Sequence, residues 1–346
     1  MTQTSTIVER VVVPVGRGPV QLCLADAGNT VVALASGSAL VTLLDGRTAE
    51  VRATIDVGDA PWNALARHAL VYVMADTVQV LDATAGRIVA TIELPPGSRP
   101  KNAVSAFERD RLYSLNTGNG TVSEIDLTSN CVVQTLDVGA GPQYGQRRNG
   151  MLFVANGESN DLAVIDESTF TVRSRIKVGR GPERCVIHKD YAQVYTNNLM
   201  DDTISIVDVA SESLVATVEV EHEPFRITPW DSRARNEWAV LCRGSGDHGG
   251  SIMFIDSDTH QVTDSVELSG TVANWNWGLG PRHQRVYVAL ANEPVLLDID
   301  AGSLAMVGGL KLSGQPEPAG YGPGIVVSSG GGVFVACEGA VMLLTE

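Results

Sequence analysis

Thr203-Ile-Ser-Ile-Val-Asp208 is a short strand-like run that ends in aspartate, and the same ending recurs along the 346-residue chain. The copies end at Asp45, Asp82, Asp126, Asp166, Asp208, Asp256 and Asp298. Their spacing averages about 42 residues, a period typical of propeller blades. A turn-rich link follows each copy, so the carboxylate is expected to accept backbone N–H groups in an Asx-turn.

A Gly/Pro element separates the units and marks where each one begins. It occurs at Val15–Pro19, Val57–Pro61, Gly97–Pro100, Val138–Pro142, Val178–Pro182 and Glu221–Pro224, and in weaker form at Leu268–Thr271 and Leu312–Pro316. Four short strands fit between successive markers. The pattern predicts an all-β fold, a single propeller domain over residues 1–346 with eight four-stranded blades; seven blades is the alternative.

The chain ends predict how the last blade is completed. Only three strands follow the eighth marker, at Gly324–Ser328, Gly332–Cys337 and Ala340–Thr345, while Ile7–Val15 is a strand without a blade. An unpaired edge strand invites aggregation, and closure removes it. We therefore expect the N-terminal strand 7–15 to complete the C-terminal blade 318–346.

Composition and charge narrow the class of protein. The net charge of −15 disfavours binding to nucleic acid or to an anionic membrane surface. There is no apolar run long enough for a transmembrane helix, and the N-terminus lacks the pattern of a secretory signal. Five scattered cysteines form no CxxC pair, which favours reduced thiols and a cytoplasmic location.

Three segments carry a family resemblance. Val194-Tyr-Thr-Asn197 with Thr203–Asp208, Arg111–Asn116 with Thr121–Asp126, and Met151–Asn156 with Leu162–Asp166 closely resemble the YVTN-repeat, or YncE-like, β-propellers. The resemblance spans essentially the whole chain and implies a propeller of four-stranded blades. It carries no catalytic residues, so the function has to be argued from the side chains.

The residue two positions after each marker proline is expected to face the mouth of the central channel. In the first six units these residues are Gln21, Asn63, Asn102, Tyr144, Arg184 and Arg226. Guanidinium groups match carboxylate or phosphate with paired hydrogen bonds, so Arg184 and Arg226 predict an anionic ligand.

Aromatic side chains are expected near the same mouth, where they suit a flat organic ligand; Trp62, Trp275, Trp277 and Tyr321 are assigned to binding. Asn274–Trp277 departs from the repeat where an inner strand should begin. Alternatively, the tryptophans fill the core between blades.

The segment Arg243–Gly250 is the longest insertion between a second and a third strand. Arg243 is assigned to binding, and Asp247 and His248 with Tyr144 are the candidate catalytic residues of a Gly-rich lid. The loop contains a G-x-G-x-x-G string, but no βαβ pattern surrounds it, so dinucleotide binding is not predicted. The alternative is a solvated hairpin.

Carboxylates are also expected at the mouth, at Glu158, Glu183, Asp201, Asp202 and Glu338. They have neither calcium-loop spacing nor accompanying histidines, so no metal and no cofactor is predicted.

These observations favour a cytoplasmic enzyme that acts on an anionic, aromatic or polycyclic small molecule by lyase, cyclase or isomerase chemistry. A non-catalytic binding or protein-interaction propeller is the alternative, and a metal-dependent, lactonase-like hydrolase is the third hypothesis.

Overall fold

The structure, a computed structural model, describes residues 8–188, 192–230, 236–245, 249–280, 283–291, 293–316 and 324–345. At 19–20, 274–280 and 283–284 it describes the backbone only. The chain forms two compact units, Leu94–Thr271 as one and Met1–Glu93 with Val272–Glu346 as the other. That residues 1–346 make a single domain stays a prediction.

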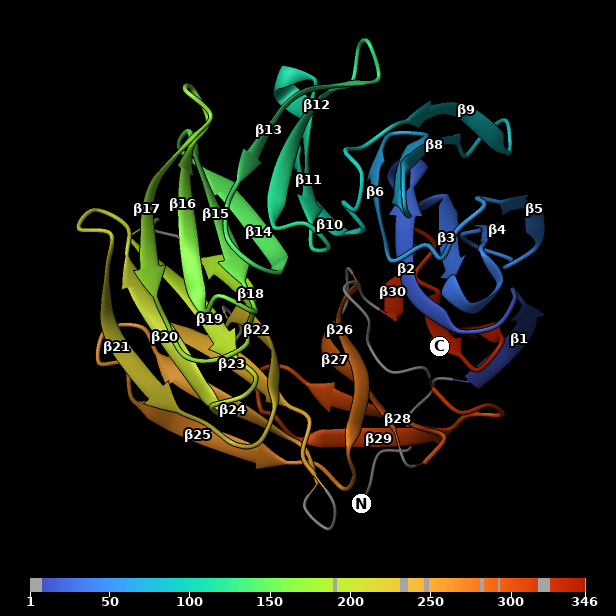
Figure 1. Ribbon diagram of the computed structural model, residues 1–346. Coiled ribbons are helices and arrows are strands. Elements are labelled where there is room, and N and C mark those ends of the chain that lie inside the picture. Colours follow the sequence, from blue (N-terminus) through green and yellow to red (C-terminus); the bar gives the residue numbers. More distant parts are fainter. Residues whose placement is uncertain are drawn as a thin grey trace. The chain divides into compact units, whose positions relative to one another are not determined.

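The unit Leu94–Thr271 contains four antiparallel sheets of four strands each, in sequence order from one edge to the other (Figure 1). The sheets are β10 (Pro100–Ala106), β11 (Arg111–Asn116), β12 (Thr121–Asp126) and β13 (Cys131–Asp137); β14 (Pro142–Arg148), β15 (Met151–Asn156), β16 (Asp161–Asp166) and β17 (Thr171–Lys177); β18 (Pro182–Ile187), β19 (Gln193–Asn198), β20 (Thr203–Asp208) and β21 (Ser213–Glu219); and β22 (Pro224–Trp230), β23 (Glu237–Cys242), β24 (Ser251–Asp256) and β25 (Val262–Glu267).

The other unit has three sheets of the same order and a fourth that joins the two ends of the chain. The three are β2 (Pro19–Ala25), β3 (Thr30–Ala35), β4 (Leu40–Asp45) and β5 (Val51–Asp56); β6 (Asn63–Arg67), β7 (Leu70–Met74), β8 (Val78–Asp82) and β9 (Arg87–Ile92); and β26 (Val272–Gly280), β27 (His283–Leu290), β28 (Val295–Asp300) and β29 (Met306–Lys311).

In the fourth sheet, β1 (Val8–Pro14) pairs with the C-terminal strands β30 (Ile325–Val327), β31 (Val333–Cys337) and β32 (Ala340–Thr345). The β1–β32 pairing is antiparallel, with Val8 opposite Thr345 and Pro14 opposite Ala340. The prediction that the N-terminal strand completes the last blade is therefore confirmed.

The fold is all-β, with eight four-stranded antiparallel blades in a propeller. The predicted blade number is confirmed, and the alternative of seven is wrong. Helical structure in the described residues is limited to three 3-10 turns, η1 (Asp26–Gly28), η2 (Ser36–Ser38) and η3 (Phe107–Arg109).

Hydrophobic cores lie between neighbouring blades within each unit. One core of the unit Leu94–Thr271 joins Tyr113 and Leu115 of β11 to Leu152 and Val154 of β15. The second and third strands of most blades are largely buried, whereas most residues of the outer strands β13, β17 and β21 are exposed. Apolar burial is therefore strongest between the blade faces, where it stabilises the stack of sheets.

The aspartates of the repeat form the predicted Asx-turns. Asp45 Oδ1 accepts hydrogen bonds from the backbone N–H groups of Arg47 and Thr48, at 2.9 and 2.8 Å. The corresponding bonds occur at Asp82, Asp126, Asp166, Asp208 and Asp256. These carboxylates therefore have a structural role in the turns.

One predicted turn aspartate is wrong by two residues. Asp300, at the end of β28, accepts the backbone N–H of Ser303 at 2.8 Å. Asp298 instead lies within β28 and pairs with Arg285, 3.3 Å from it. The sequence Leu297-Asp-Ile-Asp300 contains two aspartates in strand alternation, and the turn residues follow only the second.

Replacement of the Asp45 carboxylate tests the turn. Asp45→Ala removes the acceptor for two N–H groups and for Arg52 (2.6 Å), so we expect the free energy of unfolding to fall by about 2 kcal/mol. Asp45→Asn keeps an accepting oxygen and should lose less. Urea unfolding at neutral pH measures both variants.

The same comparison has a defined pH dependence. Hydrogen bonds from Thr48, Arg47 and Arg52 hold the pKa of Asp45 well below its usual range. Because the folded-state pKa is below the unfolded one, the contribution is complete above about pH 4 and is lost as the pH falls through the folded-state value. The difference between wild type and Asp45→Ala should therefore shrink in acid; a constant difference would contradict the assignment.

Deletion of the N-terminal strand tests the closure of the last blade. Without residues 1–14 the backbone groups of β32 lose the partner recorded in the β1–β32 pairing. We expect a lower melting temperature and concentration-dependent association, because an open edge recruits other strands. Deletion of residues 1–7 alone keeps β1 and is the control. A monomeric, equally stable 1–14 deletion in ultracentrifugation and calorimetry would contradict this role.

Candidate functional site

A β-bulge near the start of the inner strand places the predicted binding residues. In β2, β10, β14, β18, β22 and β26 the register shifts between the first and the third residue of the strand. Two residues of the inner strand then oppose one residue of its neighbour, which re-aims their side chains. The third residue is Gln21, Asn102, Tyr144, Arg184, Arg226 and Asn274, respectively.

In the unit that holds β1–β9, the predicted polar residues are largely engaged in packing. The Gln21 amide exchanges two hydrogen bonds with the Ala64 peptide of the next blade, at 3.2 and 3.1 Å. Asn63 is buried, and Trp62 is partly exposed and donates its backbone N–H to Met74 O at 2.8 Å. Gln21 therefore joins two blades.

Several predicted site residues cannot be placed by their side chains. Trp275 and Trp277 lie in the part of β26, residues 274–280, for which only the backbone is described. The segment Asn274–Trp277 is part of a regular inner strand, with the same bulge as its counterparts, so the expected interruption of the repeat there is wrong. Tyr321, Asp247 and His248 lie outside the described residues.

In the unit Leu94–Thr271, Arg184 lies over an aromatic ring of the preceding blade. Its Cζ is 4.5 Å from the centroid of Tyr144, a cation–π distance. Both residues are half-buried and start the inner strands β18 and β14. The structure thus brings the predicted Tyr144 and Arg184 together. Asn102, one blade earlier, is buried and accepts the backbone N–H of Ala103 through its own Oδ1.

Arg226 and Arg243 share a second ring. Phe225 has Arg243 Cζ at 4.6 Å and Arg226 Cζ at 6.0 Å from its centroid. Arg243 also pairs with Glu223, 3.0 Å from it. Its Nε is buried and donates to no acceptor in the described part of the chain. Arg243 was predicted from the sequence, whereas its partner Glu223 was not.

Glu183 connects these two groups electrostatically. Burial raises the pKa of its carboxyl, while the charges of Arg184 and Arg243 and a hydrogen bond from Asn197 oppose that rise. Its Oε2 is buried and accepts no hydrogen bond from any described residue. A carboxyl in this environment is suited to hold a proton.

We call these residues the arginine cluster. Its members are Arg184, Arg226, Arg243, Glu183, Glu223, Tyr144 and Phe225. All come from three consecutive blades of one unit.

Asn197 forms hydrogen bonds to the backbone of two strands of the cluster, and it is polar where most other blades have an apolar residue. The residues opposite Gln21, Asn102, Tyr144, Arg226 and Asn274 are all apolar, namely Leu34, Leu115, Ala155, Leu241 and Ala289. Opposite Arg184 stands Asn197, which is fully buried. Asn197 Oδ1 accepts the Arg184 N–H at 3.0 Å, and its Nδ2 donates to Pro224 O at 2.6 Å. It ties the inner strands β18 and β22 together.

The motif asparagine of this blade is Asn198, one residue later than the sequence indicated. Asn198 Nδ2 donates to Thr203 Oγ1 at 3.0 Å, as Asn116 Nδ2 does to Thr121 Oγ1 at 2.9 Å. Asn197 is therefore an additional polar residue. A comparison of the repeats aligned on Asn198 would have revealed it, because the equivalent positions in the other blades are apolar.

Two other predicted carboxylates, Asp201 and Asp202, belong to the link between β19 and β20. Asp201 pairs with Arg180 at 2.6 Å, and hydrogen bonds from Arg180 lower the pKa of Asp201. Asp202 accepts the Glu223 N–H at 2.8 Å and lies 3.2 Å from His222. These carboxylates are engaged in holding the links between strands.

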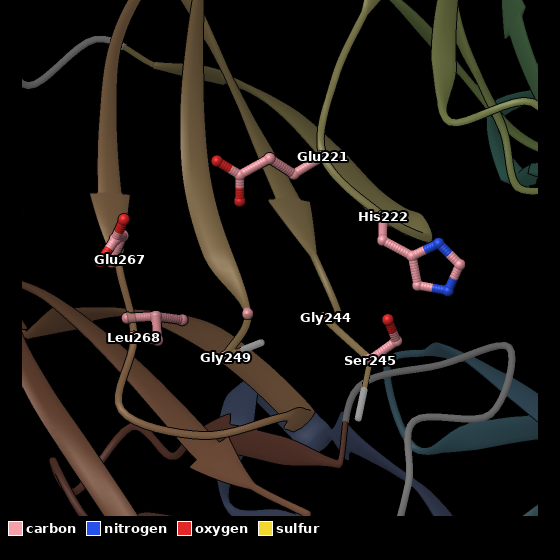
Figure 2. Close-up of a pocket in the computed structure, with 8 residues that line it drawn as sticks. Glu221, His222, Gly244, Ser245, Gly249, Glu267 and Leu268 are labelled. Carbon is pink, nitrogen blue, oxygen red and sulfur yellow. The ribbon is translucent and has the colours of Figure 1, made fainter. Parts of the chain in front are cut away.

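A pocket of about 410 Å³ lies beside the β22–β25 blade (Figure 2). Glu221 and Glu267 stand on one side of it, and His222 and Ser245 on the other. The Gly-rich segment predicted as a lid forms part of its wall through Gly244, with residues 246–248 outside the described part. Two carboxylates make this pocket unsuited to an anion.

The described residues show neither a metal-binding group nor a membrane-spanning helix. They contain no group of three or more His, Cys, Asp and Glu side chains placed to hold a metal ion. Within the same ranges, no helix has the length and apolar character needed to cross a membrane.

Comparison with known proteins identifies the fold. No family model matches the chain, and no curated protein matches it. The structure of dihydro-heme d1 dehydrogenase NirN in complex with DHE is similar, with a TM-score of 0.72 and 17% identity, over 95% of this chain and 73% of that one.

Two further solved structures have the same fold. The computationally designed Ika8 protein has a TM-score of 0.73 and 12% identity, over 96% of this chain and 99% of that one. BamB from Moraxella catarrhalis has a TM-score of 0.69 and 13% identity, over 99% and 98%. At such identities the likeness shows the fold alone.

Replacement of Asn197 by the residue of its counterparts tests its supporting role. In Asn197→Leu, the Arg184 N–H and the Pro224 carbonyl lose their partners, so the free energy of unfolding should fall by about 2 kcal/mol. Asn197→Asp keeps the acceptor for Arg184 but loses the donor to Pro224. Urea unfolding should rank wild type above both variants; a more stable Asn197→Leu protein would refute this role.

Proposed function

We propose that this protein binds an anionic small molecule at the arginine cluster and acts on it by acid/base chemistry that needs no cofactor. Three guanidinium groups with only two carboxylates support this proposal most directly. The excess of positive charge is local, within a chain of net charge −15. Such a concentration of guanidinium groups favours carboxylate, sulfonate or phosphate ligands.

The aromatic members favour a ligand with a flat organic part. Tyr144 and Phe225 each lie under a guanidinium group, so the cluster presents both charge and ring surface. We infer a substrate that is anionic and aromatic or polycyclic. Its predicted place at the mouth of the central channel stays a prediction.

The proposed class of reaction follows from the titratable side chains of the arginine cluster. Tyr144, Glu183 and Glu223 are the titratable acids of the cluster, and Glu223 is paired with Arg243. Neither redox groups nor a nucleophile–base pair accompany them among the described members. Lyase, cyclase or isomerase chemistry fits this inventory. The similarity to a dehydrogenase is a similarity of fold, and we do not transfer its activity.

The proposal includes the class and location of the protein. We propose membership of the YVTN-repeat family on the motifs that end at Asn116, Asn156 and Asn198. All five cysteines are free thiols, which supports a cytoplasmic location. The negative net charge argues against nucleic-acid and membrane partners.

A non-catalytic binding or interaction module is the second candidate. Outer strands expose apolar side chains, at Val133 of β13, Leu214 and Val215 of β21, and Val262 of β25. Exposed apolar groups of this kind favour contact with another protein when they are contiguous. A metal-dependent hydrolase, the third hypothesis, has no metal-binding group in the described residues to support it.

Binding of naphthalene-2-sulfonate, with neutral 2-naphthol as the matched ligand, tests the proposal. We expect the sulfonate to bind at least ten times more tightly, because only it engages the guanidinium groups. Arg184→Met and Arg226→Met should each weaken sulfonate binding about tenfold, which corresponds to 1.4 kcal/mol. Calorimetric titration measures all affinities.

Arg87→Met is the control, since Arg87 is an exposed arginine of β9 outside the cluster. It should bind the sulfonate as the wild type does. Equal affinity for the two naphthalenes, or wild-type affinity in both cluster variants at unchanged melting temperature, would refute the proposed function.

A further inference from the structure

We propose that Glu183 takes up a proton when an anion binds to the arginine cluster, so that ligand and proton bind together. The inference rests on the proposed function and adds the proton to it. The proton comes from the solvent and forms an O–H bond on the carboxylate, whose charge falls from −1 to zero. No electron is transferred, and the O–H group so formed is then available to the ligand.

The position of Glu183 within the bulge supports this inference. Glu183 is the second residue of β18, between Pro182 and Arg184, where the register shifts. The same position holds Lys101 in β10, Gln143 in β14 and Phe225 in β22. In these four blades Glu183 is the only carboxyl at this position, and it stands next to the arginine that contacts Tyr144.

The groups around Glu183 favour opposite protonation states. Burial is the largest influence and favours the uncharged acid, as does the negative charge of Glu223, so the pKa is raised. Arg184 on its own strand, Arg243 just after β23, and Asn197 on β19 favour the carboxylate. A new charge beside Glu183 therefore shifts the equilibrium between the two states.

A bound anion supplies that charge. It repels the Glu183 carboxylate directly, and it occupies the guanidinium groups that stabilised the carboxylate. Both effects favour protonation. With Glu183 ionised the three arginines and two glutamates sum to +1; with Glu183 protonated they sum to +2. Uptake of the proton therefore raises the net positive charge that faces the bound anion.

The buried Oε2 atom of Glu183 allows the added proton to form a hydrogen bond with the ligand. Oε2 is buried and has no hydrogen-bond partner among the described residues. Protonation turns one carboxyl oxygen into a donor, and an anion accepts a strong hydrogen bond from it. The ligand thereby supplies a hydrogen-bond partner to a buried atom that has none among the described residues.

Proton counting by calorimetry tests the inference. Naphthalene-2-sulfonate is titrated into the full-length protein in buffers of different ionisation enthalpy; the sulfonate keeps its charge across the neutral range, so any proton taken up goes to the protein. We expect net uptake by the wild type, and an affinity that falls, by up to tenfold per pH unit, as the pH rises above the Glu183 pKa. Proton uptake should be absent in Glu183→Gln, and its affinity should not change over that range.

Two further variants separate the possible sources of the proton. His222 precedes Glu223 and faces Asp202, so His222→Gln should keep the uptake if Glu183 is responsible. Asn197→Ala removes a hydrogen bond that favours the carboxylate, so the pH profile of binding should move to higher pH. This second shift tests Glu183 even if Glu183→Gln fails to fold.

The outcomes distinguish the two proposals. Sulfonate binding that depends on Arg184 but proceeds without proton uptake overturns the role of Glu183 and leaves the proposed function standing. Uptake that persists in Glu183→Gln or disappears in His222→Gln also overturns it. Binding that is absent, or independent of Arg184, refutes the proposed function itself.

Discussion

A four-stranded antiparallel sheet with two apolar faces cannot stand alone in water, and this constraint governs the whole molecule. Each blade buries its faces against neighbouring blades, as Tyr113 of β11 does against the blade of Leu152. Seven sheets consist of four strands in sequence order. The eighth has three C-terminal strands and gains its fourth, β1, from the other end of the chain. Because the blade faces are committed to this burial, variation is confined to the strand ends and links, where the polar site residues gather.

The β-bulge turns this regular scaffold into a site. In six blades it gives the inner strand two adjacent residues opposite one neighbour, so each of these blades presents a pair of side chains. In β18 the pair is Glu183 and Arg184, and in β22 it is Phe225 and Arg226. Asn197 is hydrogen-bonded to both strands and therefore links the pair in β18 to the pair in β22. In the arginine cluster the backbone geometry is the same from blade to blade, whereas the side chains differ.

The sequence predicted the fold well because the same pattern of strands and turns recurs along the chain. Strand endings at aspartate, confirmed as Asx-turns, fixed the blade boundaries; in blade five, Thr203–Asp208 matches β20 residue for residue. Asp298 was mistaken for Asp300 because strand alternation and turn chemistry coincide in Leu297–Asp300. The pairing of β1 with β32 followed from counting strands, which needs no side-chain detail.

The site was predicted less completely, because contacts between blades depend on how side chains turn. The repeat indicated Arg184, Arg226 and Tyr144 from one position, and the structure shows Arg184 on Tyr144 and Arg226 near Phe225. It did not reveal that Glu223 pairs with Arg243, because that contact joins links of different length. It missed the bridging role of Asn197 because the motif asparagine was placed one residue too early.

The pairing of β1 with β32 has a consequence for biogenesis. Synthesis produces β1 before the strands of the other blades and its partner β32 after them. The strand β1 must therefore wait for its partner until the blades between them have been made.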